Sequence, residues 1–486
     1  MTSPIRIHPL NKKLFEYKRK PVLLLCATEH YGSIMNRPFD FKKYLEYCKK
    51  TGQNYTRLFL LFRELQTPVN PYSTCKPESP DYISPYVRSG PGTSADGLLK
   101  YDLDSWNEEF FERLHNFMKI ASGCDVIVEV TLFSNNYSNE LLSLIPFGID
   151  SNINGVGDEK FEIFMTMKNA GVFDYQIKFV QKIVTELNCY DNFFFEICNE
   201  PVSFTPEIAS VDEINNWQQH LIDYVRNLES ELPKKHLIAV TECWKFHNRQ
   251  TLVADSDASF NHLTADIVNI HPLENIVYKS KSYNMGLFMS KQLCLKELRD
   301  YCLDTWNESK PLNIDEDNVA SRFKDYEGWT IHRKRAWTVL FSGAHYDYID
   351  FSIVNYCPTG TPDSQEHLHK WFKNIREFIS SVDIISGSPL TGVALNFPGE
   401  VLESVFGTPG KQYNIYIADK RELEEYGQGE IISGEIELEI KQGKYIVLYY
   451  SPEHGTAVSG NTTDGGRIKL NLPDFRHDLV IQLKNL

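Results

Sequence analysis

The chain has 486 residues, of which 42% are hydrophobic and 13% are aromatic, and its formal net charge is -15. This composition predicts a folded protein, and the length accommodates a barrel of about 250 to 400 residues together with a second domain. The acidic balance argues against nucleic acid as a partner, because phosphate binding requires clustered cations.

The sequence carries few signs of a targeting, membrane or metal-binding segment. No apolar run approaches the length of a membrane span, and Met1 to Arg6 is not followed by a continuous apolar core. We therefore expect a cytoplasmic protein with no membrane partner. The ten cysteines are scattered without a C-x-x-C pair, which predicts neither a zinc site nor a disulfide framework.

Short apolar runs alternate with helix-like segments from about residue 20 to residue 384, a pattern typical of a parallel α/β fold. Eight strands are expected, and this number favours a closed (β/α)8 barrel over an open sheet. The expected strands are Val22–Ala27, Tyr55–Leu61, Asp125–Leu132, Asn192–Ile197, His236–Thr241, Asp266–Ile270, Leu312–Asp315 and Ala344–Phe351. The expected helices are Phe41–Thr51, Ser105–Ala121, Asp174–Leu187, Glu213–Leu232, Lys291–Asn307, Trp329–Phe341 and Gln365–Ser381.

After about residue 385 the helical periodicity ends and short alternating strands appear, such as Glu435–Ile440 and Tyr445–Tyr450. Glycines punctuate them, which predicts a small all-β sandwich. We therefore expect a catalytic barrel over residues 1–384 and a C-terminal sandwich over residues 385–486. The sandwich is either a structural unit packed on the barrel or a carbohydrate-binding module, and the first is favoured because no exposed aromatic platform is evident.

The most informative segment is Phe193-Phe194-Phe195-Glu196-Ile197-Cys198-Asn199-Glu200-Pro201. Its apolar part reads as a strand buried on both faces, and Pro201 should end that strand because proline cannot donate to a ladder. Asn199 and Glu200 then lie at the carboxyl end of the strand, where parallel α/β barrels place their catalytic groups. A second short strand, entered by Lys310-Pro311, leads to Asp315, Glu316 and Asp317. The alternative for that acidic stretch is a solvated turn.

Three motifs in this order resemble clan A glycoside hydrolases such as family five. Asn199-Glu200-Pro201 is similar to the end of the fourth barrel strand in that clan, and the segment ending in Glu316 is similar to the seventh. Gly52 to Leu58, with Arg57, resembles the second. The likeness covers roughly residues 10–384. One difference is Leu273, which follows His271 by two residues where many relatives carry a tyrosine.

This resemblance implies a retaining glycosidase, in which two carboxyl groups flank the bond to be cut. Glu200 would be the acid/base and Glu316 the nucleophile. Asn199 would bind the hydroxyl next to the anomeric carbon, and Arg57 would keep Glu316 ionised. We also expect Arg57 to lower the pKa of Glu316, and like charge with partial desolvation to raise that of Glu200.

Other substrate-binding candidates follow expected strand ends. They are His30, Tyr31, Asn135, Trp244, His271, His345 and Tyr346, and Trp244 is the preferred stacking residue. Two long insertions, Gln66–Leu99 and Ser138–Met167, are expected to wall off one end of the cleft, which favours a pocket and exo action.

The expected function is a retaining β-glycosidase for short oligosaccharides or glycosides, without metal or organic cofactor. The resemblance is compatible with mannosides, glucosides and galactosides, and with either a monomer or a homo-oligomer. The alternatives are a transglycosylase that uses the same carboxylates, a non-catalytic carbohydrate-binding barrel, and a metal-dependent hydrolase. The last is not favoured, because no His-x-His pair ends a strand.

Overall fold

The computed structural model describes residues 3–62, 81–247, 251–422 and 429–486. Its central element is a sheet of eight parallel strands in the order β4-β18-β17-β14-β11-β9-β8-β5. These strands are β4 (Leu25–Cys26), β5 (Tyr55–Phe59), β8 (Ile127–Ser134), β9 (Phe193–Asn199), β11 (Ile238–Thr241), β14 (Ile267–Ile270), β17 (Leu312–Asp317) and β18 (His345–Tyr348). The sheet is a nearly closed barrel, so the predicted (β/α)8 fold is confirmed.

Asn54 joins the first and second barrel strands at the seam of the sheet. Its side-chain Oδ1 accepts from the Leu25 backbone amide at 2.9 Å, and its backbone amide donates to the Leu25 carbonyl at 3.3 Å. A side chain therefore supplies part of the pairing that a backbone ladder supplies elsewhere, and β4 is only two residues long. The expected strand Val22–Ala27 is correspondingly wrong at its start, because Val22 belongs to a separate strand.

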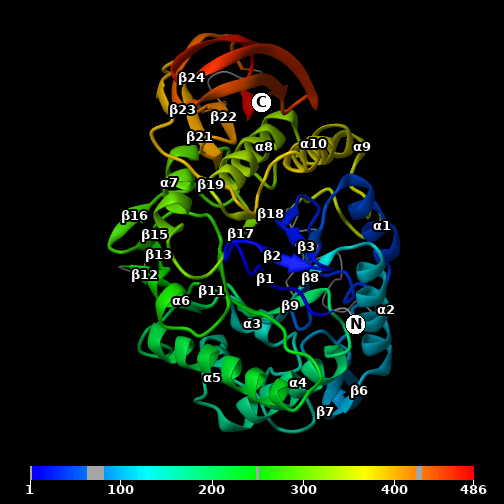
Figure 1. Cartoon of the computed structure of the whole chain (residues 1–486). Helices are drawn as coiled ribbons and strands as arrows, with labels where there is room; N and C mark the ends of the chain where they lie inside the picture. The colour runs from blue at the N-terminus through cyan, green and yellow to red at the C-terminus, as the bar shows by residue number, and fades with distance from the viewer. Residues whose placement is uncertain (1–2, 63–80, 248–250, 423–428) are drawn as a thin grey trace.

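Helices surround the barrel in the order that alternation along the chain predicts (Figure 1). The longer ones are α1 (Phe41–Thr51), α2 (Glu108–Gly123), α4 (Ala170–Leu187), α5 (Val211–Ser230), α7 (Leu295–Thr305), α8 (Tyr326–Phe341) and α10 (Lys370–Ile379). Their ends follow local sequence signals. Ser210 and Glu213 form a capping box at the start of α5, and Gly52 ends α1 with a φ of 75°.

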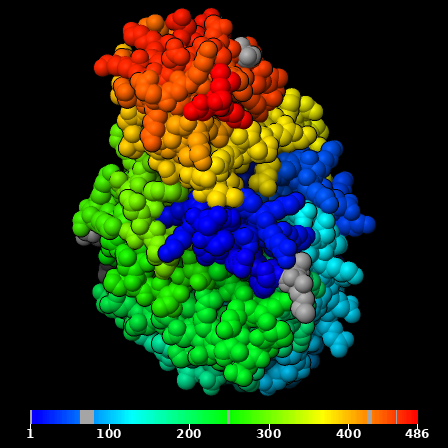
Figure 2. Space-filling model, in the orientation of Figure 1, coloured from blue at the N-terminus to red at the C-terminus, as the bar shows by residue number. Residues whose placement is uncertain are grey.

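The amino end of the barrel is covered by three N-terminal strands, β1 (Arg6–Ile7), β2 (Phe15–Tyr17) and β3 (Lys20–Val22). Phe15 stacks on Phe194, at the start of β9, with ring centroids 6.2 Å apart. Figure 2 shows this N-terminal segment in blue across one face of the molecule. Because this end is plugged, the opposite, carboxyl end is the one open to a substrate.

A five-stranded sheet that the sequence did not predict lies beyond the carboxyl ends of the barrel strands. It consists of β10 (Val202–Ser203), β12 (Trp244–His247), β13 (Thr251–Asp255), β15 (Ile276–Tyr278) and β16 (Lys281–Tyr283). All five strands come from the loops that follow β9, β11 and β14. The first expected insertion also contains structure, since β6 (Tyr86–Thr93) and β7 (Leu99–Trp106) form a hairpin. Residues 66–80 of that insertion lie outside the described residues.

The C-terminal strands form a separate antiparallel sheet, which agrees with the predicted β-sandwich. They are β19 (Ser388–Pro389), β20 (Ala394–Asn396), β21 (Val401–Thr408), β22 (Gln412–Asp419), β23 (Ile432–Ser451), β24 (Thr456–Phe475) and β25 (Asp478–Asn485). The two segments expected as separate strands are parts of the 20-residue β23, which curves strongly with β24 in Figure 1.

The sandwich packs on α8, which is buried along nearly its whole length. Arg333 of α8 donates two hydrogen bonds to Asp478, at 3.0 and 2.9 Å, and both side chains are fully buried. Trp337 stacks on Tyr416 of β22 with ring centroids 5.5 Å apart. A helix buried on both sides explains why α8 lacks the one-sided apolar stripe of a surface helix. None of the described helices combines the length and apolarity needed to cross a bilayer.

Candidate active site

The structure brings Glu200 and Glu316 together at the carboxyl end of the barrel. Glu200 directly follows β9, and Glu316 is the second-last residue of β17. A carboxylate oxygen of each and a ring nitrogen of His271 all lie within 4.8 Å of one another. Both glutamates have a left-handed backbone, with φ of 46° and 47°. For a residue with a Cβ this conformation is costly, and it aims both side chains into the space above the barrel.

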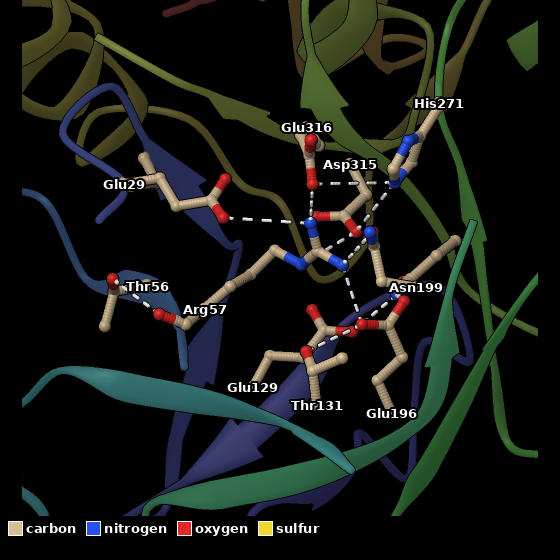
Figure 3. Close-up of polar contacts among 12 residues, drawn as sticks. Glu29, Thr56, Arg57, Glu129, Thr131, Glu196, Asn199, His271, Asp315 and Glu316 are labelled. Atoms are coloured by element: carbon tan, nitrogen blue, oxygen red, sulfur yellow. Dashed lines mark hydrogen bonds and ion pairs between the residues drawn. The ribbon is translucent and has the colours of Figure 1, made fainter. Parts of the chain in front are cut away.

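Arg57 of β5 lies at the centre of a buried group of carboxylates (Figure 3). Its Nη2 is 2.7 Å from Glu196 Oε2 and its Nε is 3.1 Å from Asp315 Oδ2. Nη1 contacts Glu316, and the guanidinium also lies 3.7 Å from Glu29. Burial disfavours the cation, but these carboxylates outweigh it and raise the pKa of Arg57 well above its usual value.

His271 links the two glutamates. Its Nδ1 donates to Glu200 Oε1 at 2.9 Å, while its Nε2 lies 3.7 Å from Asp315 and 4.0 Å from Glu316. Burial lowers the pKa of an imidazole, but here the charge of Glu316 and hydrogen bonds to Asp315 and Glu200 outweigh it and raise the pKa of His271 well above its usual value. The surroundings of the ring therefore favour its protonated form.

The pKa values of the two glutamates shift in the opposite sense to that expected from the sequence. Burial raises the pKa of Glu200, but the hydrogen bonds from His271 and Tyr137 and the charge of Arg57 outweigh it, so the net shift is downward. For Glu316, burial with the like charges of Glu200 and Asp315 outweighs His271 and Arg57, so its pKa is raised. The expectation failed for Glu200 because it omitted His271, whose Nδ1 donates to that carboxylate, and for Glu316 because it omitted burial and the charge of Asp315.

Both carboxylates open into one pocket of about 520 Å³. Its polar lining consists of Asn199, Glu200, Glu316, Asn318 and Tyr137. Asn199 Oδ1 accepts from Arg57 Nη2 at 2.9 Å, and Asn318 Nδ2 donates to Glu316 Oε1 at 3.1 Å. The rest of the described lining is apolar or aromatic and includes Tyr31, a predicted site residue. The pocket therefore offers hydrogen bonds mainly around the carboxylate pair.

Three predicted site residues near the first, third and fifth strands do not line the pocket. His30 packs against Phe39 with ring centroids 3.9 Å apart, and burial lowers its pKa to about 3. Asn135 is buried and accepts from the Tyr137 amide at 3.0 Å, so it shapes the loop that carries Tyr137. Trp244 pairs with Val202 in the sheet beyond the barrel, and this pairing places its indole ring inside a hydrophobic core.

The two candidates on β18 are also directed away from the pocket. His345 lies at the amino end of β18, where its Nδ1 accepts from the Leu24 amide at 3.0 Å and its ring stacks on Phe15. Tyr346 points to the helix layer and donates to Asp317 Oδ2 at 2.7 Å. Successive residues of a strand face opposite sides, so the two side chains miss the substrate for different reasons: Tyr346 faces the helices, and His345 lies at the closed amino end of the barrel.

Several pocket residues escaped the sequence analysis. Tyr137, whose hydroxyl bonds Glu200, is not among them, because it lies two residues after the candidate Asn135, where residues after the third strand were expected to line the pocket. Asn318 follows Glu316 by two residues, a spacing that could have flagged it. The apolar lining residues come from loops after several strands and have no common motif. Only the folded chain brings them together.

Two groups of acidic and histidine side chains have the spacing of metal ligands among the described residues. They are Glu200 with His271 and Glu316, and Glu129 with Glu196 and Asp315. In the first group Nδ1 of His271 donates to Glu200 and would have to lose its proton to bind a metal. The second group is buried and its carboxylates accept from Arg57, Tyr55, Thr131, Thr241 and Asn269. In both groups, side chains that could bind a metal already make hydrogen bonds to other protein groups.

An acidic pair at the carboxyl end of a (β/α)8 barrel is the arrangement of glycoside hydrolases, and a family comparison agrees. The model described as cellulase, glycosyl hydrolase family 5, matches residues 86–374, more than half of the chain. The chain therefore belongs to glycosyl hydrolase family 5 and is a glycoside hydrolase of a retaining clan. The difference at Leu273 does not exclude it from the family.

Solved structures share the complete architecture at low sequence identity. One described as a glycoside hydrolase is 11% identical, with a TM-score of 0.64 over 99% of this chain and 97% of that chain. A family 5 glycoside hydrolase from Bacteroides vulgatus is 12% identical, with a TM-score of 0.63 over 99% and 92%. A putative glycoside hydrolase from the same species is 11% identical, with a TM-score of 0.63 over 100% and 82%. This likeness shows the fold. No curated protein matches the chain.

Proposed function

We propose that the chain is an exo-acting retaining β-glycosidase for short oligosaccharides or glycosides, with Glu200 as acid/base and Glu316 as nucleophile. The observation that carries this proposal is that carboxylate oxygens of the two lie within 4.8 Å of each other and open into one pocket. Retaining enzymes separate their carboxyl groups by about 5–5.5 Å, whereas inverting enzymes need about 6.5–9.5 Å to admit a water.

In the first step a Glu316 oxygen attacks the anomeric carbon while the bond to the leaving oxygen breaks. As that oxygen gains charge, the proton shared by His271 and Glu200 moves onto it from Glu200. This sharing reconciles a lowered Glu200 pKa with general acid catalysis, because His271 stores the proton beside the carboxylate. Arg57 and Asn318 hold Glu316 by hydrogen bonds in the direction of attack.

In the second step a water enters where the leaving group was. Glu200 takes one proton from the water, the water oxygen bonds to the anomeric carbon, and the bond to Glu316 breaks. The proton returns to the Glu200–His271 pair, so the enzyme is restored. Asn199 would hold the hydroxyl next to the anomeric carbon, since Arg57 and Ser134 fix its amide at 2.9 and 3.2 Å.

Exo action is supported by the size of the site. About 520 Å³ is typical of a pocket for a small ligand, and the sheet beyond the barrel closes one side of it. For the domains we propose the division at residues 384 and 385 that the sequence suggests. The buried Arg333–Asp478 pair supports a structural role for the sandwich, which stabilises the barrel through α8.

Active-site variants test this function. Glu316→Gln should abolish turnover of 2,4-dinitrophenyl β-glycosides of glucose, mannose and galactose. Glu200→Ala should still release dinitrophenol in a burst, because this leaving group needs no acid, and mass spectrometry should find a sugar on Glu316. The exposed Glu207→Gln is the matched control. Wild-type turnover in either variant, or an inverted product by NMR, would refute the assignment.

A further inference from the structure

The pocket beside the catalytic pair has an unusual distribution of polar groups for a site that takes only sugars. Among the described lining residues, the charged and amide side chains are the two glutamates, Asn199 and Asn318, and hydroxyl groups come from Tyr137 and Tyr31. Tyr137 donates to Glu200 and Asn318 donates to Glu316, so these groups surround the scissile bond. These polar groups can hydrogen-bond the hydroxyls of a single sugar ring.

One remaining wall is aromatic. Tyr31 stacks on Phe59 with ring centroids 4.4 Å apart, and Phe62 meets both edge-on at 5.9 and 5.6 Å. Phe62 also contacts the Tyr137 ring at 6.4 Å, and the Tyr137 hydroxyl bonds Glu200. This aromatic wall is thus continuous with the residue that protonates the leaving oxygen.

A second group of apolar lining residues, the aliphatic wall, comes from β13 and from the loops after β14 and β16. Its members are Leu252, Leu273 and Met289, and the ring of Phe288 extends it. Backbone hydrogen bonds hold it in place, because the Leu273 amide donates to the His271 carbonyl at 2.8 Å and the Met289 amide to the Asn318 carbonyl at 3.2 Å. Leu273, which stands where many relatives have tyrosine, therefore belongs to an extended apolar surface beside the catalytic pair.

The apolar surface reaches solvent. Phe288 is 57% exposed and its neighbour Leu287 is 40% exposed. Large apolar side chains gathered at the mouth of a functional pocket indicate a ligand that covers them. A second sugar would stack one face on the aromatic wall, but its hydroxyls would meet Leu252, Leu273 and Met289 without hydrogen-bond partners, which is unfavourable. A hydrocarbon group would instead be removed from water along with the walls.

We propose that the leaving group of the natural substrate is an apolar aglycone, an alkyl chain or aromatic ring system, and not a second sugar. This inference rests on the proposed function and specifies its substrate class. The sugar lies at the carboxylate pair among Asn199, Asn318 and Tyr137. The aglycone extends from Glu200 between the aromatic and aliphatic walls toward Phe288.

The test compares octyl, methyl and disaccharide β-glycosides of glucose, mannose and galactose, with octyl glycosides below their micelle concentration. Octyl and methyl alcohols leave with similar intrinsic ease, so their ratio reports binding of the chain. We expect kcat/KM for the octyl glycoside of the accepted sugar to exceed both others at least tenfold. A disaccharide cleaved equally well or better, or equal octyl and methyl rates, would overturn the inference.

Variants of the walls sharpen the test. Leu252→Ser and Phe288→Ser should each reduce the octyl-to-methyl ratio several-fold, whereas Leu10→Ser, at a position 80% exposed, should leave it unchanged. An unchanged ratio in both wall variants would contradict the assignment of the surface. If no glycoside is turned over, including the dinitrophenyl compounds, the proposed function fails. Turnover of those compounds without octyl preference refutes the aglycone alone.

Discussion

Glu200 and Glu316 share one uncommon backbone conformation, with φ of 46° and 47° at the ends of two different barrel strands. Left-handed φ costs an ordinary residue about 1–2 kcal/mol, because its Cβ crowds the following carbonyl oxygen. The fold maintains this cost at the two positions that the proposed chemistry needs. Such strain is typical of residues that are held in place for function.

The first prediction concerns this strain. At both positions the glycine variant should be more stable than the alanine variant by about 1 kcal/mol, because glycine adopts positive φ without steric cost. The comparison removes the same side chain in both variants and is measured by urea unfolding. At Glu207, which lies outside the left-handed region, alanine should be the more stable of the two. Equal stability of Glu200→Gly and Glu200→Ala would show that the backbone is relaxed.

The second prediction concerns His271 and pH. The hydrogen bond and charge of His271 oppose the effect of burial and lower the pKa of Glu200. In His271→Asn this pKa should rise, but the proton that His271 keeps beside Glu200 to high pH is lost, so the alkaline limb of kcat/KM should move downward, to the pKa of Glu200 alone. A pH profile of kcat/KM measures the shift, and the exposed His262→Asn serves as control. An unchanged alkaline limb would show that His271 does not affect the protonation of the catalytic acid.

The third prediction concerns Arg57. Arg57→Met leaves Glu196, Asp315 and Glu316 buried without their cation, and should cost about 3–5 kcal/mol of stability at neutral pH. The deficit should shrink as pH falls, because the carboxylates then take up protons. Arg37→Met removes an exposed partner of Glu109, with both side chains more than 40% exposed, and should cost less than about 1 kcal/mol. Similar losses in the two variants would contradict the buried network.

The fourth prediction concerns the joint between barrel and sandwich. Asp478 accepts from Arg333 at 3.0 and 2.9 Å and from the Tyr416 hydroxyl at 3.1 Å. Asp478→Ala leaves the Arg333 cation buried without its partner, and should cost about 3–5 kcal/mol and lower the Tm of the whole chain in calorimetry. Glu435→Ala, at an exposed ion pair with Lys469, is the control and should leave Tm nearly unchanged. A Tm for Asp478→Ala like that of the control would show that the sandwich contributes no stability to the barrel.

Local sequence determined the eight strands and the positions of Glu200 and Glu316. The apolar run of β9 and the proline that follows it act over a few neighbouring residues, so their meaning can be inferred without the fold. The same is true of the capping box of α5. The N-terminal sheet and the sheet beyond the barrel were not predicted, because their strands are only two to five residues long and pair with distant segments.

Tertiary structure decided which side chains meet. Trp244, His345 and Tyr346 follow or form predicted strands, yet strand register turns them into cores and not toward the substrate. The pKa order of the two glutamates depends on His271, which is 71 residues from Glu200 in sequence and 2.9 Å away in space. The apolar walls of the pocket come from separate loops. Sequence alone thus determined the strand ends that carry the candidate catalytic groups, since that pattern is local. Partners, proton positions and pocket chemistry depend on barrel closure and register, which only the folded chain establishes.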